Sequence, residues 1–225
     1  GAVRCSSDNV TGKAYIFVQR NGDSMISILA GANASLSPDD IQKNRRYFEN
    51  CRFCLVQTEV PKSTVLAACR TARDCGVTTI LKPSTCSVLE PEILQYVDIL
   101  VPNLNEISLL RPEGTIEEKA GYFLEQGVGT VIVTLGAEGC YVKNRDWEER
   151  IPAVKFKAVD NTGACDAFIS ALAVYLQRGR TLKQAVQIAT YAAAFSITRE
   201  GVSPSLIDHR SLEAYIYQEC PYLLT

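Results

Sequence analysis

The sequence predicts an α/β fold built on a largely parallel sheet, with helices covering both faces of the sheet. Short apolar runs typical of strands alternate with amphipathic segments typical of helices over most of the 225 residues. Hydrophobic residues make up 47% of the chain and charged residues 21%, as in an ordinary packed domain. We therefore expect residues 1–225 to form a single domain, with residues 11–30 as a β-hairpin appended to the sheet.

The first half of the chain opens on that hairpin. The runs KAYIFVQ and MISILA are typical of two strands joined by a turn around Asn21-Gly22. Ser37 is the expected cap of the next helix, with Pro38 at its first position. The elements expected next are a short buried strand FCLVQ, a helix STVLAACRTARDCG, a strand VTTILKPS, a short helix EPEILQYV, a strand DILVPN and a helix from about Asn105.

The second half continues the alternation. Thr115 and Glu118 have the spacing of a capping box at the start of the helix IEEKAGYFLEQG. A strand TVIVTLG and a hairpin that begins with GCYVKN follow, and then a turn that opens an apolar helix at about residue 164. Thr181 is expected to cap a final long helix, LKQAVQIATYAAAFSITREG.

Composition argues against several classes of function. The net charge of -2 and the lack of a Lys/Arg cluster argue against nucleic acid as a partner. The sequence has no run of about eighteen apolar residues, so no membrane span is predicted. The N-terminus lacks the pattern of a secretion signal. Nine cysteines, spread through predicted strands and helices, favour reduced thiols in a cytoplasmic protein. Cys51 and Cys54 have the spacing of a metal or redox pair, but no second pair follows at zinc spacing, which favours a structural role for both. His209 is expected at a solvated helix start.

The turn before residue 164 is unusually rich in small residues, Thr162-Gly163-Ala164-Cys165-Asp166. N–H groups at the positive end of a helix bind anions. A carboxylate beside such a site suits a base that removes a hydroxyl proton while the amides hold a phosphoryl group. The alternative is that Asp166 only caps a helix that happens to start with small residues. The turn alone leaves both explanations open.

Two other strand ends carry candidate site residues, and ligands of open parallel sheets sit beyond the carboxyl ends of the strands. The segment Thr134–Gly139 has glycines that let a ligand approach the backbone, although a hairpin turn needs glycines too. Asn103, Asn105 and Glu106 suit a magnesium ion and its waters, although helix capping is the commoner use of such residues. The agreement of the three features favours a phosphate site at this edge.

The residues resemble a known family. No P-loop, protein-kinase or G-x-S-x-G motif occurs. However, AVDNTGACDAFISALA resembles the D-T-x-G-A-G-D signature of the ribokinase-like, PfkB-type carbohydrate kinases. The likeness continues in order through TGKAYIFVQRNGDSMISILAGANASLSP (lid strand), LVQTEVP, VDILVPNLNE (N-x-x-E motif), VTLGAEG (nucleotide loop) and ITREGVSPS. It implies a three-layer α/β/α sandwich in which residues 11–30 are the remnant of a β lid.

The resemblance also implies an activity and its partners. The family transfers the γ-phosphoryl group of ATP to a sugar or related alcohol, with Mg²⁺ and a monovalent cation such as K⁺. Asp166 would be the general base, the amides of Gly163, Ala164 and Cys165 the anion hole, and Glu59 a sugar contact. The residues implied for magnesium, phosphate and nucleotide are Asn103, Glu106, Thr134, Gly136, Ala137, Glu138, Gly139 and Thr190. The residues implied around the cation are Asp160, Thr162, Ser196, Arg199, Gly201 and Ser205, several through backbone carbonyls.

The chain departs from the family pattern in two places. Cys165 stands where the signature has its second glycine, so we expect a tighter anion hole. The family's first strand, part of its lid and its G-G-x-x-x-N motif precede the segment that matches Thr11, and they have no counterpart here. The chain therefore resembles the C-terminal two-thirds of such a kinase, and we expect a fragment with little activity alone.

Three functions stay open from the sequence. The first is a sugar kinase, and the segment AGANASLSP favours a ribose-like acceptor. The second is a non-catalytic remnant that binds nucleotide or a partner protein. The third is a nucleoside or hydroxymethyl-pyrimidine kinase. Unpaired strand edges also predict a homodimer, formed through the hairpin of residues 14–30.

Overall fold

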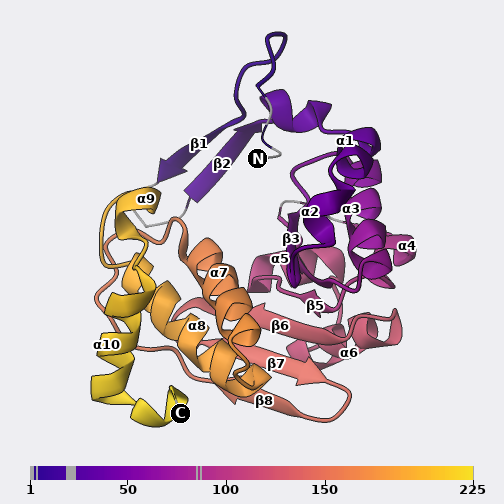
Figure 1. The fold of residues 1–225 in the computed structure, drawn as a ribbon. Helices are drawn as coiled ribbons and strands as arrows, with labels where there is room; N and C mark the ends of the chain where they lie inside the picture. The colour runs from indigo at the N-terminus through magenta and orange to yellow at the C-terminus, as the bar shows by residue number, and fades with distance from the viewer. Residues whose placement is uncertain (1–2, 4, 19–23, 85, 87, 225) are drawn as a thin grey trace.

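Two separate sheets organise the chain (Figure 1). The computed structural model describes residues 3, 5–18, 24–84, 86 and 88–224. Within them, a six-stranded sheet has the order β3-β4-β5-β6-β7-β8, and β1 pairs with β2 in a two-stranded sheet. Strands β3 to β6 run parallel, whereas β7 and β8 are antiparallel additions at one edge. The prediction of a largely parallel sheet is confirmed.

The elements follow the predicted alternation. The strands are β1 (Lys13–Val18), β2 (Ser24–Leu29), β3 (Phe53–Gln57), β4 (Thr78–Lys82), β5 (Ile99–Leu100), β6 (Thr130–Thr134), β7 (Cys140–Asn144) and β8 (Glu148–Ile151). The α-helices are α1 (Pro38–Lys43), α2 (Arg45–Phe48), α3 (Lys62–Asp74), α4 (Pro91–Leu94), α5 (Leu104–Leu110), α6 (Ile116–Glu125), α7 (Ala164–Gln177), α8 (Leu182–Ser196), α9 (Val202–Ser205) and α10 (His209–Glu219). Short 3₁₀ turns are η1 (Gly31–Ser35), η2 (Gly136–Glu138) and η3 (Pro221–Leu223).

Helices cover both faces of the large sheet and create two cores. Consecutive residues of a strand point to opposite faces, so Ile132 packs in one core with Leu172 of α7 and Ile188 of α8. Its neighbour Val131 packs in the other core with Phe123 of α6. Figure 1 shows α7, α8 and α10 on one side of this sheet and α5 and α6 on the other. The three-layer α/β/α architecture is confirmed.

Most helices begin at the residues that the sequence predicts. Ser37, Thr115 and Thr181 each accept a hydrogen bond from the backbone of the third helical residue, and each is part of a reciprocal capping box. His209 is the exposed first residue of α10, which Asp208 caps. The residues that determine each of these helix starts are close together in the sequence, which is why the starts could be predicted.

Three local expectations were wrong. The strand at 53–57 is not fully buried, because β3 is an edge strand of the described sheet and Leu55 is 47% exposed. The segment DILVPN contributes only Ile99–Leu100 as a strand. The helix from Leu182 ends at Ser196 and is followed by α9 and α10. It ends there because the Ile197 carbonyl accepts from the N–H groups of Val159 and Asp160, at 2.7 and 3.2 Å.

The hairpin stands away from the body of the molecule (Figure 1). Strand β1 pairs antiparallel with β2, in a register that sets Lys13 opposite Leu29, so the predicted pairing is confirmed. The turn expected around Asn21-Gly22 lies outside the described residues. Five apolar side chains of this sheet are 41–60% exposed: Tyr15, Ile16, Phe17, Ile28 and Leu29.

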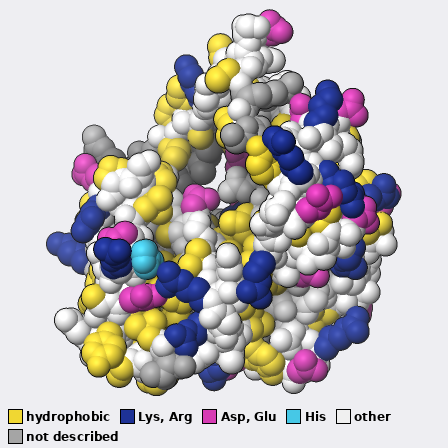
Figure 2. Space-filling model, in the orientation of Figure 1, with side chains coloured by type: hydrophobic (Ala, Val, Ile, Leu, Met, Phe, Trp, Pro, Cys, Tyr) yellow, Lys and Arg dark blue, Asp and Glu magenta, His cyan; other side chains and the backbone are white. Residues whose placement is uncertain are grey.

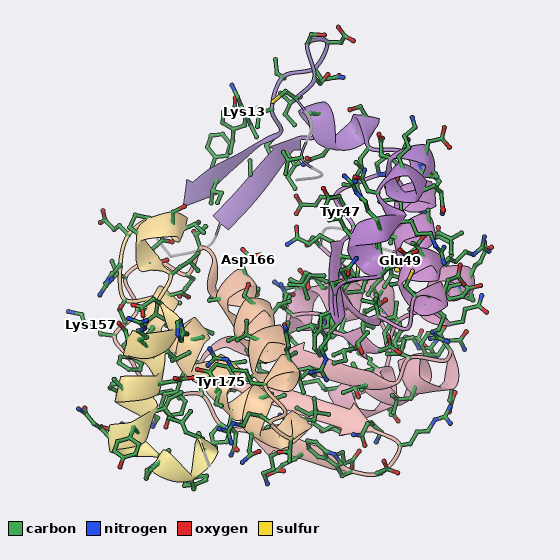
Figure 3. All side chains as sticks on the ribbon, in the orientation of Figure 1. Lys13, Tyr47, Glu49, Lys157, Asp166 and Tyr175 are labelled. Carbon is green, nitrogen blue, oxygen red and sulfur yellow. The ribbon has the colours of Figure 1, made fainter. Side chains whose placement is uncertain are left out.

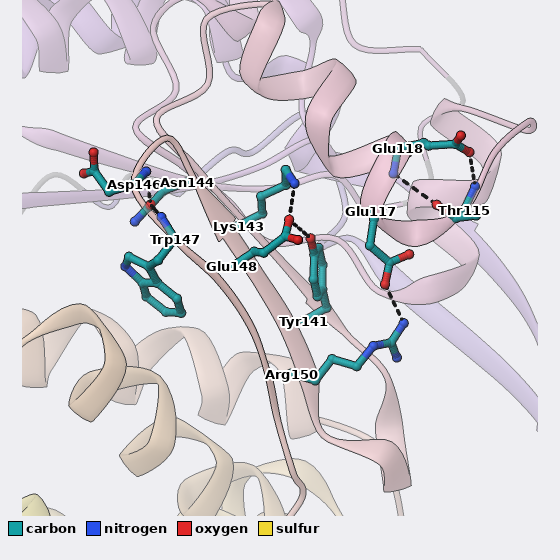
Figure 4. A network of polar contacts seen from close by, with 10 residues as sticks. All are labelled: Thr115, Glu117, Glu118, Tyr141, Lys143, Asn144, Asp146, Trp147, Glu148 and Arg150. Atoms are coloured by element: carbon teal, nitrogen blue, oxygen red, sulfur yellow. Dashed lines mark hydrogen bonds and ion pairs between the residues drawn. The ribbon is translucent and has the colours of Figure 1, made fainter.

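A network of polar contacts secures the antiparallel edge of the large sheet to α6 (Figure 4). The Tyr141 hydroxyl donates to Glu148 at 2.7 Å across β7 and β8, and Lys143 pairs with the same carboxylate. Arg150 of β8 donates to Glu117 in the first turn of α6 at 2.9 Å. This edge is therefore held by side chains as well as by the strand ladder.

In the residues that the structure describes, no helix has the length and apolar character needed to cross a bilayer.

Gly139 is predicted to be essential for stability. It has φ +92°, and a Cβ there would lie 2.0 Å from the Ile151 carbonyl oxygen, so Gly139→Ala should cost about 3 kcal/mol or more. Gly76→Ala is the matched control, because Gly76 has φ +69° but open space around it, and should cost about 1–2 kcal/mol. Urea unfolding of both variants measures the difference, and equal losses would contradict this account.

Candidate active site

The carboxyl ends of the parallel strands meet the first turn of α7 at one edge of the sheet. Gln57, the last residue of β3, donates to Asp166 Oδ1 at 3.2 Å. Lys82, the last residue of β4, pairs with Glu106 of α5. Asn103, which follows β5, forms a parallel bridge with Thr134, the last residue of β6. The edge that favours ligands in such sheets therefore carries all three of the segments that the sequence singled out.

The N-terminus of α7 presents free N–H donors. Gly163 is the cap residue, with φ +88° and no side chain to fill the cap. In the part of the chain that the structure describes, no backbone carbonyl accepts from the N–H groups of Gly163, Cys165 or Asp166. The Ala164 N–H makes only a long contact of 3.4 Å with the Asn161 carbonyl. Free donors of this kind, at the positive end of a helix, are able to bind an anion.

Asp166 is exposed and does not cap the helix. It lies in the first turn of α7, two residues beyond its first residue, and the cap position belongs to Gly163. The explanation of Asp166 as a simple N-cap is therefore wrong. Figure 3 shows Asp166 at the end of α7 that faces the opening below β1 and β2, and Figure 2 shows the molecule hollowed there. A carboxylate in this place can accept a proton from a bound ligand.

Asn103 and Glu106 do cap a helix. The Asn103 side chain accepts from the Glu106 N–H at 2.8 Å, and Glu106 Oε2 accepts from the Asn103 N–H at 2.7 Å. The capping explanation is confirmed for both residues. One oxygen of Glu106, Oε1, has no partner among the described residues. A role in holding magnesium is therefore compatible with the cap, and it stays a prediction.

The two glycines of the 134–139 segment differ in what surrounds them. Gly139 is packed against the backbone of residues 151–153, so the turn itself requires it. Gly136 has φ +59°, and a Cβ there would meet nothing within 4 Å. The η2 residues Gly136, Ala137 and Glu138 are all exposed. Residues 136–138 are therefore the part of this segment that is open to solvent, and their role in a nucleotide site stays a prediction.

The residues expected around a monovalent cation come from the loop before α7 and from the segment after α8. Asp160 Oδ1 accepts from the Thr162 N–H at 2.9 Å, and Asp160 Oδ2 accepts from the Gly201 N–H at 3.1 Å. A hydrogen bond from the Thr162 side chain, together with these two N–H groups, holds the pKa of Asp160 below its usual range. The structure thus brings three of the six residues into one network.

The other three residues expected around the cation make side-chain hydrogen bonds to residues nearby in the sequence. Ser196 and Ser205 are buried and donate to the Ala193 and Val202 carbonyls, and Arg199 makes a long contact of 3.5 Å with the Pro204 carbonyl. Thr190 in α8 is also buried, with its hydroxyl donating to the Gln187 carbonyl. The hydrogen of each of these three hydroxyls is therefore used within its own helix, which leaves the hydroxyl oxygen able to act as an acceptor.

Glu59 lies half-buried after β3 and lines a pocket of about 370 Å³. Most of the pocket is apolar, with Leu36, Ile41 and Val60 on its walls, and Gln57 also lines it. Because Gln57 also contacts Asp166, the structure joins the expected sugar contact to the first turn of α7.

Two residues of this edge were missed in the sequence. Gln57 and Lys82 are the last residues of two otherwise largely apolar strands, and that position was the available signal.

Burial raises the pKa of the Cys165 thiol, while the nearby Lys82 ammonium and the Thr134 hydroxyl lower it. Cys165 therefore lies close to both the lysine and the end of β6.

Comparison with curated proteins identifies close relatives in sequence. The chain is 33% identical over 202 residues to a ribokinase of Staphylococcus aureus, covering 87% of this chain and 66% of that protein. It is 33% identical over 220 residues to a deoxyribokinase of Salmonella typhi, covering 95% of this chain and 71% of that protein. The chain thus spans about two-thirds of the length of these relatives.

Solved structures give the same result. A ribokinase from Thermotoga maritima matches with a TM-score of 0.84 and 36% identity, over 92% of this chain and 70% of that one. Arabidopsis thaliana ribokinase, solved in complex with ribose and ATP, matches with a TM-score of 0.83 and 28% identity, over 91% and 69%. The model of a protein family described as pfkB family carbohydrate kinase matches residues 3–209 of the chain. The chain belongs to this family.

Proposed function

We propose that the chain acts in ATP-dependent transfer of a phosphoryl group to the hydroxyl of a sugar. The observation that carries the proposal is the first turn of α7, where free N–H donors adjoin an exposed carboxylate that the helix does not use as a cap. Phosphoryl transfer depends mainly on positioning and on neutralising charge, and such a turn supplies both. Membership of a carbohydrate kinase family supports the same reaction.

Each part of the edge has a role in this proposal. The N–H groups of Gly163 and Cys165 bind phosphoryl oxygens, and Asp166 accepts the proton of the acceptor hydroxyl. Magnesium, when bound, neutralises phosphate charge, and the free oxygen of Glu106 beside Asn103 fits it because magnesium prefers oxygen ligands. The exposed turn of Gly136, Ala137 and Glu138 lies where the nucleotide would pass.

A cation site is part of the proposal as well. Asp160 ties the loop before α7 to Gly201, so a monovalent cation bound there would act on the position of the anion-binding turn. Gly163 itself is covered by Val202, since a Cβ on Gly163 would lie 2.9 Å from Val202 Cγ1. The α9 segment therefore supports the turn on one side.

A pentose is the acceptor that we propose. The relatives most similar in sequence include proteins named ribokinase and deoxyribokinase, and one matching structure holds ribose and ATP. Glu59 and Gln57, which line one pocket, are the polar groups available to contact the sugar. The exposed Asp166 favours this catalytic function over a nucleotide-binding remnant, because α7 does not use that carboxylate as its cap.

We also propose that the chain forms a homodimer through β1 and β2. The hairpin exposes apolar side chains from both of its strands, and a two-stranded sheet is marginal without a partner surface. Tyr15, Phe17 and Leu29 share one face of the hairpin, so a second copy packed on that face would bury these three side chains.

Asp166→Asn should lower the rate of sugar phosphorylation by about 10²–10⁴-fold, because the amide cannot accept the proton. Binding of Mg·ATP, measured by calorimetry, should persist, because the N–H donors are unchanged. Asp146→Asn is the matched control, since Asp146 is an exposed carboxylate of the turn between β7 and β8. Equal rates for Asp166→Asn and wild type, in a form of the protein that phosphorylates sugar, would refute the assignment of the base.

Cys165→Gly should tighten nucleotide binding by about fivefold, the equivalent of about 1 kcal/mol, if the side chain crowds the anion site. The change also introduces a glycine into the first turn of α7 and should lower stability by about 1 kcal/mol. Calorimetric affinity and urea unfolding, measured together, separate the two effects. An unchanged affinity and an unchanged turnover would exclude crowding.

Phe17→Glu should shift the protein from dimer to monomer in light scattering, because Phe17 is 60% exposed on β1 and a charge there opposes burial. Tyr217→Glu is the control, as Tyr217 is an aromatic residue on α10 that is 69% exposed. A wild-type protein that is monomeric at high concentration, or a Phe17→Glu dimer, would refute this interface.

A further inference from the structure

Lys82 is a buried lysine at the proposed active site, and the proposed function assigns it no role. It is the last residue of β4 and is only 6% exposed. Lysine is rarely so buried unless its charge is paired. Its ammonium pairs with the Glu106 carboxylate on α5, which itself is only 12% exposed. The pair therefore joins a strand of the sheet to a helix at the carboxyl edge.

Glu106 makes both of its described contacts through one oxygen. Oε2 accepts from the Lys82 ammonium and from the Asn103 N–H, the latter at 2.7 Å. Oε1 has no hydrogen-bond partner among the residues that the structure describes. In that part of the chain, some side-chain atoms are both buried and without a partner, and Oε1 is not one of them. The carboxylate is thus fixed at one oxygen and free at the other.

The ion pair lies close to the turn that would hold the phosphates. Lys82 lowers the pKa of the Cys165 thiol and Glu106 raises it, so both charges act on the first turn of α7. Asn103, the other member of the capping box, bridges to Thr134 at the end of β6. The free oxygen of Glu106 therefore belongs to the edge that the proposed function assigns to phosphate and magnesium.

We propose that Lys82 is a positioning residue, which holds Glu106 by Oε2 so that Oε1 is presented to the magnesium ion of a bound nucleotide. The inference rests on the proposed function of this edge. A buried carboxylate with a single N–H partner would be poorly compensated, and it would turn toward water if the ammonium were removed. Partners that orient a ligating carboxylate act in this way at metal sites.

A purely structural role for the pair makes a different prediction. If Lys82 only connects β4 to α5, its removal lowers stability but leaves the response to magnesium intact in the folded fraction. If Lys82 orients Glu106, its removal lowers the gain in nucleotide affinity that magnesium provides. The gain is the ratio of ADP affinities with magnesium and with chelator, so it does not depend on catalytic activity.

The test is calorimetric titration of the chain with ADP, in magnesium and in EDTA, for wild type and Lys82→Met. We expect the magnesium-dependent gain to fall by about 10- to 100-fold in Lys82→Met, the usual effect of removing such a partner. Lys119→Met is the matched control. Lys119 is also buried, at 7% exposure, but donates to Ser108 at 3.0 Å on the far side of α5. Its removal should lower stability without changing the gain.

The outcomes separate this inference from the proposed function. If Lys82→Met keeps the magnesium-dependent gain of the wild type, the positioning role is overturned and the proposed function still stands. Absence of ADP binding by wild type in either condition overturns both. If Lys82→Met does not fold, Lys82→Ala serves instead, because it also removes the donor to Glu106 Oε2 and leaves space for water beside the carboxylate. A gain in Lys82→Ala between the wild-type value and unity supports the inference, and an unchanged gain overturns it.

Discussion

The structure depends on one constraint, which is that β3 to β6 run parallel and therefore end at a single edge. Gln57 and Asp166 are far apart in the sequence, yet they are in hydrogen-bond contact because β3 ends where α7 begins. The same constraint sets Asn103 beside Thr134. Without it, the glycine-rich turn, the capping box and the exposed Asp166 would be unrelated local features of the chain.

The parts of the fold and site that could be predicted are those encoded locally. A capping box needs two residues three positions apart, so Thr115 and Thr181 were identified correctly as helix starts. The alternation of strands and helices predicted the sheet, because each element's apolar pattern is visible in the sequence. The turn at Gly163 was also visible, since small residues before an apolar helix form a continuous stretch. Even there, only the structure shows that Gly163 holds the cap position and that Asp166 does not cap the helix.

The parts that could not be predicted depend on neighbours distant in the sequence. Leu55 is exposed because β3 lies at the edge of the described sheet, and no pattern within FCLVQ specifies an edge. Gly136 and Gly139 look alike in the sequence, but only Gly139 packs against residues 151–153. The long helix ends at Ser196 because the Ile197 carbonyl binds the loop before α7, which is a contact between distant segments.

The case of Asn103 and Glu106 shows that a structural and a functional explanation of one residue need not exclude each other. The sequence posed a choice between helix caps and magnesium ligands, and the structure confirms the caps. A carboxylate has two oxygens, however, and the cap uses only one. The cap and Lys82 together limit the rotation of Glu106, so the contacts that stabilise α5 also fix the direction of the remaining oxygen. At this edge, the stability of the helix start and the geometry of the proposed ligand site therefore depend on the same atoms.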